Sequence, residues 1–373
     1  MSINVFVPKF HTEEILLEIK ECLEKGWTGL GFKTVEFENK WKEYSGVKNA
    51  HFVNSNTSGL HLAVHVFKKI YGWKDDDEII TTPLTFVSTN HVILYEKLKP
   101  VFADVDQFLC LDPISVKSRI TSRTKAIMYV GLGGNTGQYQ EILNICKENN
   151  LKLILDAAHM SGTKWKGKQV GPEADAAVFS FQAVKNLPTA DSGMICFQDD
   201  DMDKLARQLS WLGISKDTYQ RFNTKEGSYK WYYDVPNVGF KYHGNSIVAA
   251  IGLVQLKYLE EDNKQRNALA NYYIEHLKDL KDFKIIPIAD ECYSSRHLFQ
   301  VSTANRNEKI EQLYSNGIYP GVHYADNTNY VMYRYAKGTC PKAEYFSDNI
   351  ISLPLHLNIT EKEIDFIISI LKS

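Results

Sequence analysis

The chain has 373 residues, enough for one large domain and one smaller domain. Its formal net charge is −2 and it contains no long basic run, which argues against a nucleic acid as the main partner. No stretch of 18 apolar residues and no leader-like N-terminus is present, so we expect a cytoplasmic protein without a signal peptide or membrane-spanning helix.

Two groups of residues resemble metal sites, and the sequence favours an ordinary role for both. The six cysteines are scattered without a CxxC pair, which is typical of reduced thiols. The acidic run 75–78 reads as a solvated turn, because consecutive side chains do not converge on one ion. We therefore expect no metal site.

The first predicted elements are two helices separated by a glycine-containing loop. Apolar residues recur at helical spacing over residues 12–25, with Thr12 as the expected N-cap and Gly26 as the end. Residues 27–31 form the loop, and a second helix is predicted over about 34–44.

From residue 50 onward, strands and helices alternate. The predicted strands are 51–53, 78–82, 101–103, 126–130, 152–155, 176–179 and 194–197, with helices at 59–71 and 138–149 among them. Strands that are apolar throughout indicate a mainly parallel central sheet covered on both faces, which is an α/β fold. Ligands of such sheets bind at the carboxyl ends of the strands.

The C-terminal third has a different texture. Residues 247–280 are predicted as one long helix, or as two helices divided near Asp262 and Asn263. Strands at 283–288 and 297–302 and helices at 308–315 and 360–371 follow. We predict a large domain over 1–245 and a smaller C-terminal α/β domain over 246–373.

Two neighbouring strand ends carry an acid and an amine. Asp156 follows the run 153–155, while Ser180 and Lys185 follow the strand at 176–179. Taken singly, Asp156 fits a cap or turn and Lys185 fits a solvated surface residue. Because the ends of parallel strands meet at one edge, the combination favours a shared crevice.

Two further strand ends add a possible anion site and a flat wall. Thr57 and Ser58 precede a helix, where they can either bind an anion or simply cap the helix. Phe86 either stacks on a ring or belongs to the core. An amine, a carboxylate, an anion cradle and an aromatic face are what pyridoxal phosphate requires. The glycines at 131–137 lack the spacing of a nucleotide loop, so we interpret them as a tight turn.

Motifs along nearly the whole chain resemble one family in order and spacing. They are Phe37-Glu38, 53–62, Thr85-Phe86, 101–106, 124–127, 156–159, 179–181 with Lys185-Asn186, 239–242 with 249–252, His323-Tyr324 and 353–355. The sequence thus resembles the DegT/DnrJ/EryC1/StrS family of sugar aminotransferases, whose members have the aspartate-aminotransferase-like fold type I.

The resemblance implies a role for each matching residue. Lys185 would be the catalytic lysine that bonds covalently to the cofactor, pyridoxal 5'-phosphate (PLP, or PMP in its amine form). Cofactor-binding residues would be Asp156, His159, Ser180, Thr57, Ser58 and Phe86, joined by Lys241 and Asn245 from the neighbouring subunit of a homodimer with shared active sites. Substrate-binding residues would be Thr28, Gly29, Gly31, His323 and Tyr324.

The implied reaction moves an amino group from glutamate to C3 or C4 of a nucleotide-linked keto-deoxysugar, for polysaccharide, lipopolysaccharide or related amino-sugar biosynthesis. A sugar-nucleotide dehydratase is one alternative, but such relatives carry histidine where this chain has Lys185. A non-catalytic scaffold is another, against which the joint presence of Asp156, Ser180 and Lys185 weighs.

The chain departs from the family pattern at several positions. Asn56 replaces a glycine, Ala190-Asp191-Ser192-Gly193 replaces glycine-glutamate-glycine-glycine, and Gly131 stands where histidine is usual. Lys241 and His243 occupy positions that usually carry asparagine and arginine. These positions lie where substrate or the neighbouring subunit is expected, so they leave the substrate's identity open.

Overall fold

A seven-stranded sheet forms the centre of the computed structural model, which describes residues 2–215 and 233–372. Its strands are β2 (His51–Val53), β3 (Glu78–Thr81), β4 (Lys99–Phe102), β5 (Thr124–Val130), β6 (Lys152–Ala157), β9 (Ala176–Ser180) and β10 (Gly193–Phe197). They lie in the order β2-β10-β9-β6-β5-β3-β4, and every neighbouring pair is parallel except the two pairs that contain β10. The predicted mainly parallel sheet is confirmed.

Helices cover both faces of this sheet, because its strands are apolar on both sides. In β6, Leu153 and Leu155 join one buried cluster and Ile154 joins the other. The first cluster includes residues of α2 (Phe32–Ser45), α5 (Pro113–Arg119), α6 (Tyr139–Glu148) and the beginning of α9 (Ser246–Leu277). The second includes residues of α3 (Asn56–Tyr71), α4 (Ser88–Tyr95) and α7 (Asp200–Ser210). Helix α1 (Thr12–Glu24) packs against α9.

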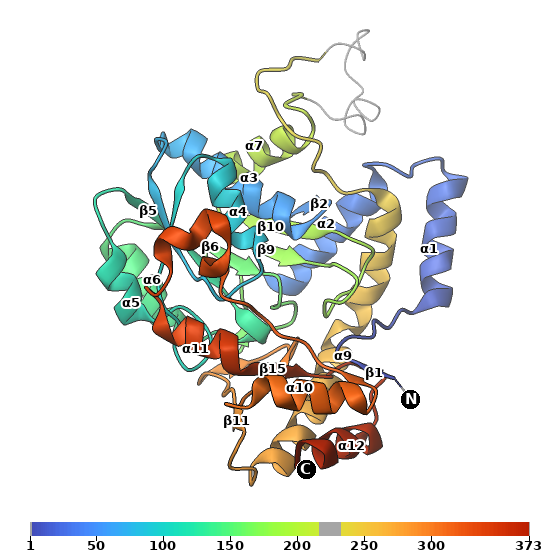
Figure 1. Ribbon diagram of the computed structural model, residues 1–373. Coiled ribbons are helices and arrows are strands. Elements are labelled where there is room, and N and C mark those ends of the chain that lie inside the picture. Colours follow the sequence, from blue (N-terminus) through green and yellow to red (C-terminus); the bar gives the residue numbers. More distant parts are fainter. Residues whose placement is uncertain (1, 216–232, 373) are drawn as a thin grey trace.

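The long helix α9 links the central sheet to a smaller antiparallel sheet, and both chain ends lie near that sheet (Figure 1). The small sheet has the order β11 (Lys284–Ile285), β13 (Phe299–Ser302), β15 (Ile350–Leu353), and it packs with α10 (Arg306–Ser315) and α12 (Glu361–Lys372). Strand β1 (Ile3–Asn4) pairs with β14 (Ile318–Tyr319) beside it. The division at residues 245 and 246 stays a prediction.

Short elements complete the described chain. They are the three-stranded sheet of β12 (Cys292–Tyr293), β7 (Lys164–Trp165) and β8 (Lys168–Gln169), helix α11 (Pro341–Asn349), and the 3-10 turns η1 (Leu132–Gly134), η2 (Asn327–Asn329) and η3 (Val331–Ala336). All six cysteines are free thiols. Among residues 2–215 and 233–372, no helix is both long and apolar enough to cross a membrane.

Two sequence predictions about helices were wrong, and the choice between one and two C-terminal helices is decided in favour of one. Thr12 is the first residue of α1 and not its cap; His11 holds the cap position and its side chain makes no capping bond. Helix α3 begins at Asn56, three residues before the predicted start. Helix α9 continues through Asp262 and Asn263 because both side chains are buried, and Asn263 Nδ2 donates to the Ser161 carbonyl at 2.9 Å.

Candidate active site

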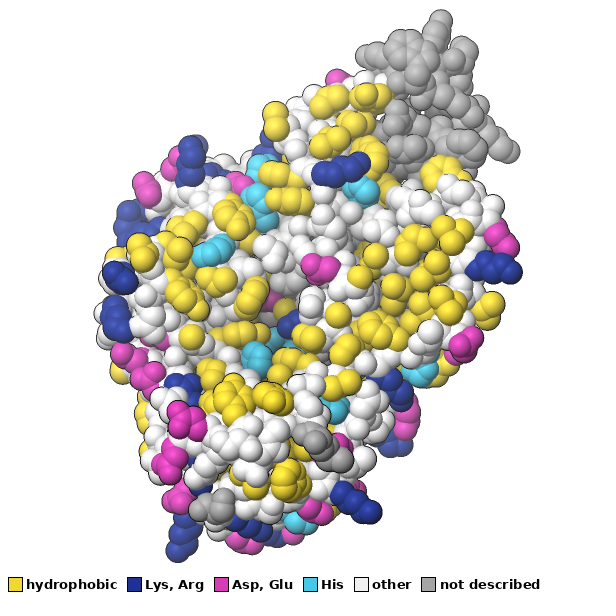
Figure 2. Space-filling view, turned by 45° about the vertical axis from the view of Figure 1, so that its right-hand side comes forward, with side chains coloured by type: hydrophobic (Ala, Val, Ile, Leu, Met, Phe, Trp, Pro, Cys, Tyr) yellow, Lys and Arg dark blue, Asp and Glu magenta, His cyan; other side chains and the backbone are white. Residues whose placement is uncertain are grey.

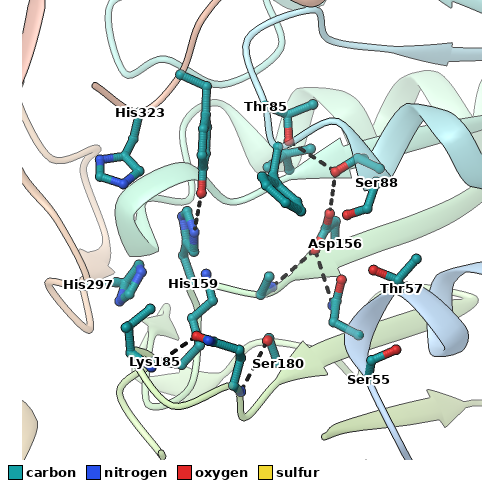
Figure 3. A pocket seen from close by; sticks show the side chains of 18 of the residues that line it. Ser55, Thr57, Thr85, Ser88, Asp156, His159, Ser180, Lys185, His297 and His323 are labelled. Atoms are coloured by element: carbon teal, nitrogen blue, oxygen red, sulfur yellow. Dashed lines mark hydrogen bonds between the residues drawn. The ribbon is translucent and has the colours of Figure 1, made fainter. Parts of the chain in front are cut away.

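The carboxyl ends of the central strands surround a pocket of about 430 Å³. Figure 2 shows a hollow in this face, with histidine and lysine or arginine side chains visible inside it. The pocket is lined by residues that follow β2, β3, β6 and β9, together with side chains from the C-terminal third of the chain. Figure 3 shows these side chains pointing toward a common space.

Asp156 stands near the end of β6, where three donors hold its carboxylate. Thr89 Oγ1 donates to Oδ2 at 2.8 Å, and the Ala158 amide donates to Oδ1 at 3.2 Å. Asn56 Nδ2 also donates to Oδ1, at 3.4 Å. The side chain is buried, and burial raises the pKa of Asp156 above its ordinary value, although these hydrogen bonds and the charge of Lys185 oppose the rise. A buried carboxylate of this kind gains most from a cation placed beside it.

Lys185 lies across the same pocket, on the loop of residues 181–192 that follows β9. Two hydrogen bonds shape the turn: Gln182 Oε1 accepts from the Val184 amide, and the Gln182 carbonyl accepts from the Lys185 amide. Exclusion of water lowers the pKa of Lys185 to about 8, and the negative charge of Asp156 partly opposes this effect. About a tenth of the amine is therefore unprotonated at pH 7, far more than for a lysine with the ordinary pKa.

A set of hydroxyl groups gathers at the N-terminus of α3. Ser55 caps this helix by accepting from the Ser58 amide at 3.1 Å, and Ser55, Thr57 and Ser180 all line the pocket. The first amides of a helix lack intrahelical partners, so this end attracts an anion. The cap is therefore Ser55 and neither of the two residues that the sequence suggested.

Phe86 forms one wall of the pocket and is 58% exposed, so the alternative that it belongs to the core is wrong. Its ring lies 6.1 Å from the ring of Tyr324. The hydroxyls of Thr85 and Thr89 lie 3.0 Å apart behind it, and Thr89 continues to Asp156. Phe86 thus offers an apolar face beside the carboxylate.

Three histidines and a tyrosine form the opposite wall. The Gly133 amide donates to His159 Nδ1 at 3.1 Å, so a neutral His159 carries its proton on Nε2, 3.2 Å from the Tyr324 hydroxyl. Burial lowers the pKa of His159 and of His297 well below the ordinary value, and lowers that of His323 to about 4. The wall is therefore uncharged at neutral pH and can donate or accept hydrogen bonds.

The pocket brings together most of the residues that the sequence singled out. Those lining it are Lys185, Asp156, His159, Ser180, Thr57, Phe86, His323 and Tyr324. Ser58 lies outside the lining, because its hydroxyl donates to Asn54 Oδ1 at 2.7 Å.

The remaining predicted residues lie elsewhere on this chain. Lys241 Nζ is 3.3 Å from the centre of the Trp211 ring, and Asn245 caps α9 by accepting from the Val248 amide. The loop of Thr28, Gly29 and Gly31 adjoins Asn245, since the Ser246 amide donates to the Gly29 carbonyl at 2.8 Å. Neither group lines the pocket within one chain.

The sequence reasoning missed several residues that line or support the pocket. Ser55 and Thr89 belong to the same strand ends as the predicted residues, so their position gave a usable signal. Phe6 and His297 gave none: their rings stack at 5.2 Å although 291 positions separate them in the sequence. Asn56, which the sequence showed only as a departure from the family pattern, donates through Nδ2 to Asp156 Oδ1 and to the Val178 carbonyl.

The departure at Gly131 has a steric explanation. A Cβ atom at this position would lie 2.0 Å from the Met160 sulfur, so any side chain there requires Met160 to move. Met160 is buried in the core beneath the pocket. A larger residue at this position would therefore need a different Met160 side-chain conformation.

The residues present fit pyridoxal phosphate. Among the residues that the structure describes, none forms an ion pair or hydrogen bond with the Lys185 amine, and none forms an ion pair with Asp156. The ring nitrogen and aldehyde of the cofactor would complement these two groups, and the hydroxyls at α3 would receive its phosphate. The residues of the pocket therefore complement pyridoxal phosphate both at its ring and at its phosphate.

Comparisons with known proteins show similarity over nearly the whole chain. The spore coat polysaccharide biosynthesis protein SpsC of Bacillus subtilis is 33% identical over 97% of this chain and 94% of its own length. Helicobacter pylori PseC, an aminotransferase involved in pseudaminic acid biosynthesis, superposes with a TM-score of 0.90 at 28% identity, covering 100% of this chain and 99% of its own.

A third similar protein has been solved with and without its cofactor. The sugar aminotransferase Spr1654 of Streptococcus pneumoniae in its PMP form superposes with a TM-score of 0.90 at 27% identity, covering 98% of both chains, and a PLP form also matches. The model of the DegT/DnrJ/EryC1/StrS aminotransferase family matches residues 9–372. The chain therefore belongs to the DegT/DnrJ/EryC1/StrS aminotransferase family.

Proposed function

We propose that the protein is a PLP-dependent aminotransferase that moves an amino group from glutamate to the C3 or C4 keto carbon of a nucleotide-linked deoxysugar. The observation that carries the proposal is the convergence of Lys185 and Asp156 on one pocket beside the hydroxyls at the start of α3. The names of similar proteins support the acceptor class: they include an aminotransferase of pseudaminic acid biosynthesis, a protein described as a sugar aminotransferase and a spore coat polysaccharide biosynthesis protein.

Each residue has a defined part in this reaction. When bound, pyridoxal phosphate supplies an electron-accepting ring next to the amine that is transferred. Asp156 would hold a proton at the ring nitrogen, and Lys185 would act as the acid and base that moves the proton. Ser55, Thr57 and Ser180 would hold the phosphate, and Phe86 would supply an apolar surface beside the ring.

The charge of the pocket lining supports a homodimer with shared active sites. Lys185 is the one lysine or arginine among the described residues of the lining, so the pocket offers little positive charge for the cofactor phosphate. Lys241, supplied by a partner subunit, would provide a cation for that phosphate. Leu16, Leu17 and Leu23 of α1 are 55–68% exposed, and Figure 2 shows hydrophobic side chains gathered to the right of the hollow.

The proposal is tested with a panel of keto-sugar nucleotides, glutamate and mass spectrometry of the products. We expect one acceptor to gain an amino group and the Lys185→Ala variant to form no product. Glutamate alone should shift the visible absorbance of the bound cofactor in the wild-type protein. If that shift occurs and no sugar is aminated, the acceptor class is wrong; if no visible band depends on Lys185, the enzyme assignment is wrong.

A further inference from the structure

A second group of polar side chains lies outside the active site, where α3 meets the end of α4. His61 and His65 belong to α3, and Glu96 follows α4 directly. One donor atom from each residue lies within 4.8 Å of the other two. Glu96 Oε1 is 2.8 Å from His61 Nε2 and 2.9 Å from His65 Nδ1. None of the three residues lines the pocket or takes part in the proposed reaction.

The local sequence explains why these side chains converge. Residues four apart lie on the same face of a helix, so His61 and His65 point the same way. The chain turns sharply after α4, where Lys97 has a φ of 54° and its amide donates to the Leu94 carbonyl. This turn brings Glu96 back against the exposed edge of α3.

The surroundings resemble those of a metal ligand set. His61 Nδ1, the ring nitrogen that faces away from Glu96, lies 3.1 Å from the Tyr242 hydroxyl. Histidine ligands usually bond a neighbour through their second nitrogen, which fixes the ring. Phe240 packs against both imidazoles, with centroid distances of 4.9 and 5.3 Å. One side is open to water, since the His65 side chain is 24% exposed.

We propose that His61, His65 and Glu96 bind one divalent transition metal ion such as Zn²⁺, with water completing the coordination. Two imidazoles and a carboxylate are a donor set that Zn²⁺ accepts. Tetrahedral coordination at the usual bond lengths separates donors by about 3.3 Å. The two contacts to Glu96 therefore need to lengthen by about 0.5 Å when the ion replaces the protons between them.

The ion would fix the geometry of α3. This helix carries the hydroxyls of the active site at its N-terminus, and its second and third turns hold the two histidines. Through Tyr242, the ion would also tie α3 to the segment that contains Lys241. A ligand that binds the folded chain and not the unfolded chain raises the melting temperature by an amount that grows with the logarithm of its free concentration relative to the Kd.

The test is a calorimetric titration of the chelator-treated holoenzyme with ZnCl₂, paired with metal analysis after dialysis. We expect one ion per chain in the titration and a melting temperature that continues to rise with free Zn²⁺ after one equivalent is bound. His65→Gln should weaken binding by at least about 100-fold, and Tyr242→Phe by about 10-fold. His91→Gln is the matched control: His91 lies on α4, bonds the Tyr333 hydroxyl and should leave the affinity unchanged.

Other outcomes would overturn the proposal. If Zn²⁺ shows no saturable binding, the three residues form a hydrogen-bonded cluster and not a metal site. If His65→Gln binds Zn²⁺ as tightly as wild type, the ion sits elsewhere. If His61→Gln fails to fold, the His65→Gln variant still tests the site, because His65 is more exposed. The visible absorbance bands of bound Co²⁺ in the wild type should then change or disappear in His65→Gln. Lys185→Ala should bind Zn²⁺ normally, which separates this site from the proposed enzymatic function.

Discussion

At the scale of single residues, the pocket controls the protonation of one amine. The environment of Lys185 lowers its pKa to about 8 from the usual 10.5. An amine reacts only when it is unprotonated, so labelling of Lys185 in the cofactor-free protein should rise with pH through a midpoint near 8. Peptide mass spectrometry at different pH values measures this midpoint.

The Asp156→Asn variant provides the control for that titration. Removing a nearby negative charge takes away the interaction that favours the ammonium form, so the midpoint of Lys185 labelling should move to lower pH. A midpoint that stays in place would show that the two side chains do not interact across the pocket.

Asp156 should also decide the rate. We expect Asp156→Asn to reduce transamination by about 10²–10³-fold, because the loss of one preorganised electrostatic partner has an effect of this size. Thr89→Val removes one of the hydrogen-bond donors to the Asp156 carboxylate but leaves the negative charge of Asp156 in place. The rate of Thr89→Val should therefore lie between the rates of Asp156→Asn and the wild type. Equal rates for wild type and Asp156→Asn would contradict the assigned role; the measurement is the initial rate with glutamate as donor.

Sequence reasoning was most useful for residues at strand ends. Asp156 and Lys185 could be placed in one crevice because the carboxyl ends of neighbouring parallel strands meet at one edge. Phe6 and His297 could not be found in this way, since their contact joins the N-terminal segment to the C-terminal third of the chain. Ser55 was missed because Thr57 and Ser58, beside it, are equally good capping residues.

At the scale of elements, the start of α3 distinguishes two neighbouring hydroxyls. Thr57 lines the pocket, whereas the Ser58 hydroxyl is bonded to Asn54. Thr57→Val should therefore weaken cofactor binding by about 10-fold, the value of one hydrogen bond to a charged group, and Ser58→Ala should leave it nearly unchanged. Fluorescence titration of the cofactor-free variants measures both constants; a larger effect at Ser58 would contradict the geometry.

The elements themselves were predictable where their pattern was regular. All seven strands of the central sheet were found, because each is an apolar run between turn residues. The sequence left open whether residues 247–280 form one helix or two, because Asp262 and Asn263 are polar residues that are typical of a helix break. Both side chains are buried within one continuous helix, and Asn263 donates to the distant Ser161 carbonyl, a partner that no local pattern shows.

At the scale of the whole molecule, the proposed dimer makes a complementation prediction. Lys185 belongs to one subunit's pocket and Lys241 would serve the partner's. Mixing inactive Lys185→Ala and Lys241→Ala proteins under conditions that exchange subunits should restore about one quarter of wild-type activity, since half the dimers would carry one intact site. Activity assays after mixing test this, and no recovery in a verified mixed dimer would place Lys241 outside the shared site.

The residue that follows the reactive lysine joins distant parts of the chain. Asn186 Nδ2 donates to Asn263 Oδ1 of α9 at 2.7 Å and to the Ser295 carbonyl at 2.6 Å, while its Oδ1 lies 3.0 Å from His297 Nδ1. Any displacement of the C-terminal third relative to the central sheet would strain these bonds and shift the lysine. Binding of the pyridoxal group at Lys185 and packing of the C-terminal third against the central sheet are then thermodynamically linked. Each makes the other more favourable by the same factor.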